Sequence, residues 1–118
     1  MSRMNTAKMV GYCAYIAEEQ LNTYLPDKLW KIKTKKTLMP KYAWYMINSN
    51  GPHEHFASIA TGTSASMINI TKKDLYAVDV VIPSAEEQLK IVKYIDKVIS
   101  KIDKLLSEKQ SLIEDLEA

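Results

Sequence analysis

The sequence contains little cysteine, glycine or proline: one cysteine, three glycines and four prolines occur in 118 residues. Because Cys13 is alone, no internal disulfide bond is possible, and the first residues lack the charged start and apolar core of a signal peptide. The apolar runs are far shorter than the roughly 20 residues that span a bilayer. We therefore expect one small domain in the reducing cytoplasm, with no membrane partner.

The motifs of common enzymes are also missing. No glycine-rich phosphate loop occurs, and Ser64 and Ser66 lack the surroundings of a nucleophile elbow. His53 and His55 flank Glu54, but a metal site needs further ligands at suitable spacing, so a polar helix start is the more common explanation. We predict a binding protein rather than an enzyme, with no metal and no cofactor.

Positive charge is concentrated in the first 50 residues, which hold eight lysines and arginines against three acidic residues. The remaining residues hold eight against eleven, so the net charge of +2 conceals an electropositive first half. Such a surface suits a polyanion such as DNA. From charge alone, a lysine-rich solvated surface without a partner is the more common explanation.

Three segments have the composition of β-strands. Residues 10–17 are β-branched and aromatic, and residues 28–33 alternate apolar side chains with lysines. Residues 78–82 form an apolar run that Pro83 ends. We predict a strand in each segment, with the lysines of the second strand facing solvent.

Short helices are predicted between these strands. Pro40 favours a helix start before residues 42–50, and a second helix is predicted at about residues 54–59. Thr71, with an acidic residue three positions later, forms a capping box before another short helix. The small, polar residues 61–66 predict a loop.

From residue 84 onward the chain is predicted to form one long helix. Ser84 and Glu87 have the spacing of a capping box, and Glu86 adds negative charge near the positive end of the helix dipole. No proline or glycine follows, so nothing in the sequence ends the helix. At about 1.5 Å per residue the helix is roughly 50 Å long, more than a small domain needs for its own core.

The apolar residues of this helix repeat at heptad spacing, interrupted at Lys109. The residues of this seam are Val92, Ile95, Ile99, Ile102, Leu106, Ile113 and Leu116. A second seam beside it comprises Ile91, Val98, Leu105 and Leu112. We predict that the near part packs on its own domain while the far part forms a coiled coil with a second helix. The alternative is a helix that lies back on its own domain.

Several short motifs follow one another in a distinctive order. They are the small-residue stretch from Gly62 to Ile70, the apolar segment ending in Pro83, the pair Glu87-Gln88, and the pairs Ile95-Asp96 and Ile102-Asp103. In this order they resemble the end of a target recognition domain and its spacer helix in the DNA specificity subunit of type I restriction-modification systems. The resemblance covers nearly the whole chain.

The resemblance implies a division of labour within an α+β protein. Residues 1–83 would be part of a target recognition domain that reads double-stranded DNA, and residues 84–118 would form a spacer helix. This helix would pair with its counterpart in a homodimer and dock the methyltransferase (modification) subunits and, through them, the restriction subunit. The chain itself would have no catalytic activity.

The residues that suit DNA contact are lysines, a loop with small side chains, and one asparagine. Lysines can bind phosphates, the loop lets backbone amides approach closely, and Asn69 can read a base, although a turn role explains Asn69 equally well. The candidates are Lys31, Lys33, Lys35, Lys36, Gly62, Thr63, Ser64, Asn69, Lys72 and Lys73.

The sequence leaves two alternatives open. The family's recognition domain is longer at its N-terminal side, and full subunits carry two such domains, so we expect a natural fragment or a truncated piece of a longer subunit. The alternative function is an adaptor module that dimerises through its helix and does not bind nucleic acid.

Overall fold

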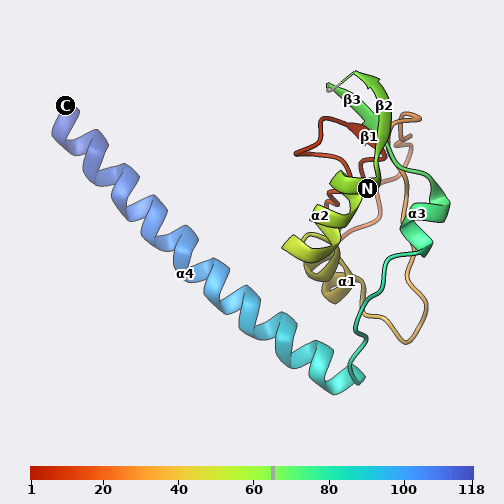
Figure 1. Ribbon diagram of the computed structural model, residues 1–118. Coiled ribbons are helices and arrows are strands. Elements are labelled where there is room, and N and C mark those ends of the chain that lie inside the picture. Colours follow the sequence, from red (N-terminus) through yellow and green to blue (C-terminus); the bar gives the residue numbers. More distant parts are fainter. Residues whose placement is uncertain (65) are drawn as a thin grey trace.

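A three-stranded sheet forms one end of the molecule, and a long C-terminal helix starts at the other end and projects away (Figure 1). The computed structural model describes residues 1–64 and 66–118, with the backbone alone for Thr63. Its strands are β1 (Met4–Asn5), β2 (Thr61–Ser64) and β3 (Met67–Asn69). Its helices are α1 (Pro40–Ile47), α2 (Asn50–Ile59), α3 (Lys72–Tyr76) and α4 (Ala85–Glu117). These elements confirm the predicted α+β fold class.

The strands lie in the order β1-β3-β2, and both neighbouring pairs are antiparallel. The predicted loop at residues 61–66 is wrong over its first four residues, which form β2, and Ala65 lies outside the described residues. Gly62 permits the pairing with β3, because a Cβ atom there would lie only 2.4 Å from the backbone oxygen of Met67. Small residues that allow two strands to approach closely thus look like a loop in the sequence.

A small hydrophobic core joins the sheet to α2. Val10, Phe56 and Ile70 are fully buried, and they come from the N-terminal segment, from α2 and from the position just after β3. Partly buried apolar residues surround them: Met1, Trp30, Ile47, Ile59, Ala60, Ile68, Leu75 and Val78. The core therefore draws on the N-terminal segment, the sheet and three short helices.

The three strands predicted from composition are wrong. Residues 10–17 contribute Val10 to the core and then run as irregular chain. In residues 28–33, only the beginning lies beside the N-terminus, where the backbone amide of Trp30 donates to the first residue at 2.8 Å. Residues 78–82 connect α3 to α4 without a partner strand. Composition that favours strands yields extended chain when no neighbouring strand supplies the hydrogen-bond ladder.

The helices agree better with the sequence. α1 and α2 lie where helices are predicted, but residues 50–51 begin α2 rather than ending α1. The capping box at Thr71 is confirmed. The capping box of α4 is also confirmed, since the Glu87 carboxylate accepts from the Ser84 amide at 3.0 Å and the Ser84 hydroxyl accepts from the Glu87 amide at 3.3 Å.

Gly11 provides a test of the core. Its φ is +87°, and a Cβ atom would lie 2.6 Å from the Phe56 ring. We expect Gly11→Ala to lower the free energy of unfolding by about 2 kcal/mol or more, because backbone strain and overpacking add. Urea denaturation measures this change. The control is Gly51→Ala, which should be neutral or slightly stabilising because nothing lies within 4 Å of the added Cβ atom. An equal fall in the free energy of unfolding in both variants would contradict the described packing at Gly11.

Candidate nucleic-acid interface

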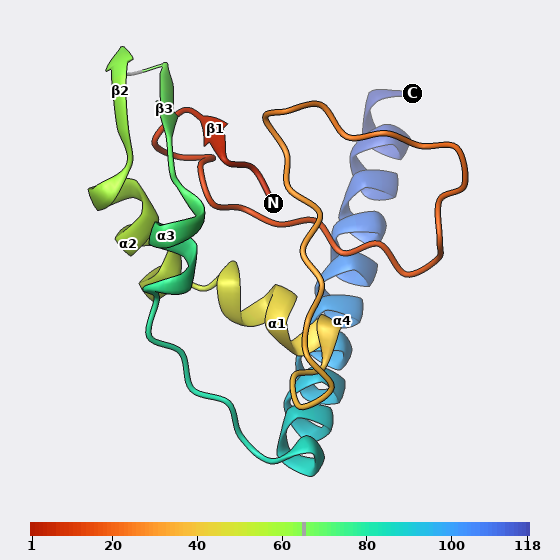
Figure 2. The ribbon, with the colours of Figure 1, turned by 90° about the vertical axis from the view of Figure 1, so that its right-hand side faces the viewer.

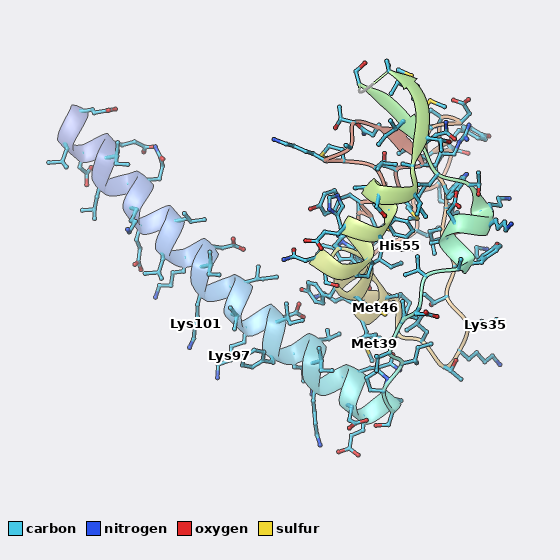
Figure 3. The ribbon with its side chains drawn as sticks, in the orientation of Figure 1. Lys35, Met39, Met46, His55, Lys97 and Lys101 are labelled. Atoms are coloured by element: carbon cyan, nitrogen blue, oxygen red, sulfur yellow. The ribbon has the colours of Figure 1, made fainter. Side chains whose placement is uncertain are left out.

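Lysines gather on one side of the globular part, on two elements that we call the basic face: the extended chain at residues 31–36 and helix α3. Both elements face the viewer in Figure 2, and Lys35 points away from the helices in Figure 3. The exposed lysines of this face are Lys31, Lys33, Lys35, Lys36, Lys72 and Lys73. Within the described part of the chain none of them forms an ion pair, so their charges are free to meet an anion.

The remaining candidates lie in the β2–β3 hairpin, which extends past α3 at the end of the molecule (Figure 2). Gly62 and Thr63 lie in β2, and the side chain of Thr63 is outside the described part. Ser64 is exposed near the hairpin tip. The Asn69 side-chain amide donates to the backbone oxygen of Thr61 at 3.0 Å. Asn69 therefore has a structural role in holding the hairpin together.

A buried glutamine joins α4 to the globular part. Gln88 lies in the first turn of α4 and is 1% exposed. Its side-chain nitrogen donates to the backbone oxygens of Thr37 and Pro83, each at 2.9 Å, and its side-chain oxygen accepts from the amide of Met39 at 2.8 Å. One side chain thus satisfies backbone groups on both segments that lead into α1 and α4.

An ion pair makes a second junction two turns further along α4. One carboxylate oxygen of Asp96 accepts from the Lys41 ammonium at 2.7 Å, and the other accepts from the Tyr45 hydroxyl at 2.5 Å. Val92, between Gln88 and Asp96 in the sequence, is buried. Among the helices and strands of the described residues, α1 is the only one that α4 packs against.

These contacts shift the pKa of Tyr45 on α1 and of Asp96 on α4. The hydrogen bond to Asp96, aided by partial desolvation and by the negative charge, raises the pKa of Tyr45 to about 12. The Lys41 ammonium, followed by the Tyr45 hydroxyl, holds the pKa of Asp96 below its usual range. The charged carboxylate and the neutral phenol are therefore the stable partners at neutral pH.

Beside this ion pair, α1 also holds the N-terminal segment. The Trp44 indole and the Asn48 side-chain amide both donate to the backbone oxygen of Cys13, at 2.9 and 2.8 Å. The Asn48 side-chain oxygen accepts from the Cys13 amide at 2.9 Å. Trp44 also stacks between Tyr15 and Tyr45, with ring centroids 5.7 and 4.6 Å away. α1 is thus the element that links the long helix to the rest of the chain.

The predicted heptad residues fall into two groups. Val92 is buried and Ile95 half-buried. The later residues of the seam are exposed: Ile99, Ile102, Leu106, Ile113 and Leu116. The second seam, from Ile91 to Leu112, is exposed as well. Beyond residue 96, α4 therefore carries an apolar stripe that remains exposed in the described part of the structure.

From the sequence alone, no role is predicted for the junction residues Gln88, Asp96, Lys41 and Tyr45. A signal was present, because Gln88 and Asp96 lie four residues on either side of Val92 and so share its face of the helix. Polar residues that interrupt an apolar stripe at this spacing indicate specific hydrogen bonds within a packed interface.

The comparison with protein families decides the identity of this arrangement. A family model described as "Type I restriction modification DNA specificity domain" matches residues 3–115. The chain belongs to this family. The search of curated proteins finds no match, and the search of solved structures finds none either. The resemblance noted from the sequence motifs is confirmed by the family match.

Membership gives this specificity domain its general role, DNA specificity in type I restriction-modification. The family is non-catalytic in general. Over residues 1–64 and 66–118, no group of three or more histidine, cysteine and acidic side chains is placed to hold a metal ion. In the same part of the chain, no helix combines the length and the apolar character needed to cross a membrane.

The Tyr45–Asp96 bond can be tested by titration. The neutral phenol stabilises the fold fully below pH 10, the usual pKa of tyrosine, and this contribution is lost as the pH rises through about 12. We expect Asp96→Ala to return the pKa of Tyr45 toward 10, as followed by NMR of the Tyr45 ring. Asp103→Ala, an exposed control seven residues further on, should leave the pKa near 12. An unchanged pKa in Asp96→Ala would contradict the described bond.

Proposed function

We propose that this specificity domain recognises part of a duplex DNA target through its basic face and the β2–β3 hairpin, and directs methyltransferase and restriction subunits to that site. The family match over residues 3–115 carries the proposal. The globular part, residues 1–83, takes the DNA-reading role in this proposal. The long helix, residues 84–118, takes the role of spacer and assembly element.

The basic face supports the DNA-reading role through its chemistry. Lysines that are exposed and form no ion pair with the residues described by the structure can replace the counterions of phosphates, and this replacement makes binding depend on salt. The hairpin beside α3 supplies exposed small and polar residues, which suit close approach to a groove. Because Asn69 already bonds Thr61, we assign base reading to the hairpin as a whole rather than to Asn69 alone.

Salt dependence tests the basic face. Replacing both Lys72 and Lys73 by alanine should weaken binding to duplex DNA and lower the slope of log affinity against log salt by about 2. The matched control removes the same charge from α4, at Lys97 and Lys101 (Figure 3), and should leave the slope nearly unchanged. Fluorescence anisotropy with labelled DNA measures both. An equal loss of DNA affinity in the two double variants would show that overall charge, and not this face, attracts DNA.

The exposed stripe of α4 supports pairing with a second helix. The face that holds Gln88 and Asp96 is turned toward α1, while Ile91, Val98 and Ile102 remain exposed on the neighbouring face. A partner helix can therefore lie along α4 without displacing its own globular part. We propose a homodimer through this stripe, with methyltransferase subunits docked on the paired helices.

A charge within the stripe tests the pairing. Leu106→Glu should shift sedimentation from dimer to monomer, because a carboxylate at the centre of an apolar helix interface loses its hydration. The control Ser107→Glu adds the same charge about 100° around the helix, off the stripe, and should keep the dimer. A dimer that survives Leu106→Glu would place the interface elsewhere. A dimer without any DNA binding would favour an adaptor module.

A further inference from the structure

We infer that Gln88 and Asp96 are positioning residues: together they set the angle at which α4 leaves the DNA-reading part. The two side chains make specific bonds from α4 to the α1 region, one buried and one at the surface. The inference about the angle stands on this geometry alone. Its consequence for DNA rests on the proposed function.

The two contacts act at separate points on the helix. Gln88 and Asp96 are eight residues apart, which is about 12 Å along the axis. A single contact would leave α4 free to pivot about it, whereas two contacts at this separation fix both register and tilt. Between them only Val92 of α4 is buried, and its apolar contact does not by itself prevent sliding.

The bonds at each point oppose movement in different ways. Gln88 holds backbone groups before α1 and before α4, so a shift of either segment leaves buried polar groups unsatisfied. Asp96 binds Lys41 and Tyr45, two half-buried residues one turn apart on α1, and so sets the rotation of α4 against α1. The Tyr45 ring is itself fixed by stacking on Trp44, which is bonded to the N-terminal segment.

The length of α4 amplifies a small change at this junction. The helix continues for 21 residues from Asp96 to Glu117, or about 32 Å. A tilt of roughly 10° at the junction therefore moves the far end by about 5 Å, more than the rise of roughly 3.4 Å per base pair. In a complex that spaces two recognition domains with this helix, the junction would select the separation of the half-sites.

The angle can be measured in the full chain by electron paramagnetic resonance. One spin label replaces exposed Glu54 on α2, the other replaces exposed Ser111 on α4, and Cys13→Ala removes the remaining thiol. An excess of unlabelled chain removes distances between molecules. With the junction intact, we expect one narrow distance distribution.

The variants make the test specific. Asp96→Ala and Gln88→Leu should each broaden or shift the distribution by about 5 Å or more, while Asp96→Asn, which keeps an acceptor for Tyr45, should give a smaller change. Asp103→Ala repeats the Asp96 change at an exposed position one heptad further on and should leave the distribution narrow. If Gln88→Leu fails to fold, Asp96→Ala decides the question, because Asp96 is only partly buried.

Two outcomes would overturn the inference. An unchanged distribution in folded Asp96→Ala would mean that Asp96 does not help to set the angle. An equal broadening in Asp103→Ala would mean that the far helix bends independently of the junction. Cooperative thermal unfolding of each variant confirms that the comparison is made between folded chains.

The consequence for DNA has a separate readout. In complexes with methyltransferase subunits, duplexes with half-sites at different separations should be discriminated less sharply when Asp96 is replaced by alanine. Loss of this discrimination with DNA affinity retained supports the positioning role. Absence of DNA binding by the unsubstituted complex would refute the proposed function but leave the measured angle, and the inference about it, intact.

Discussion

The packing of α1 against α4 is the interaction on which the rest of the structure depends. Through neighbouring positions, α1 is bonded both to the N-terminal segment, by Trp44 and by Asn48 at its end, and to α4, by Lys41 and Tyr45. The small hydrophobic core lies toward the sheet and does not reach α4. Besides the chain that follows α3, α1 and the segment just before it hold the long helix to the globular part.

Polar bonds make this contact more specific than an apolar one of similar size. Apolar surfaces tolerate sliding, because the hydrophobic effect is not directional. The Gln88 amide satisfies three backbone groups at once, and a displaced helix would leave them without partners in a buried site. A displaced α4 would therefore lose these hydrogen bonds, so they favour one register of α4 against the segments that lead into α1 and α4.

Features that depend on neighbours in the sequence were predictable, and features that depend on distant partners were not. The cap at Ser84, the unbroken helix after it and the exposed lysines all follow from local spacing and composition. The strands were missed because strand pairing is non-local, and β3 pairs with residues near the N-terminus. The junction was missed for the same reason, since the bond from Gln88 to Thr37 joins residues 51 positions apart.

The exposed far part of α4 determines where the unpaired chain opens most readily. Beyond residue 100, every described residue of the helix is exposed, so its backbone amides are protected by the helix's own bonds alone. An isolated helix of such length is only marginally stable in water, so this segment opens locally far more readily than the core. Proteases cleave opened backbone, and a bound partner raises the free energy of opening. The far part of α4 is thus the segment that a protease would reach first in the unpaired chain, and the pairing proposed above would protect it.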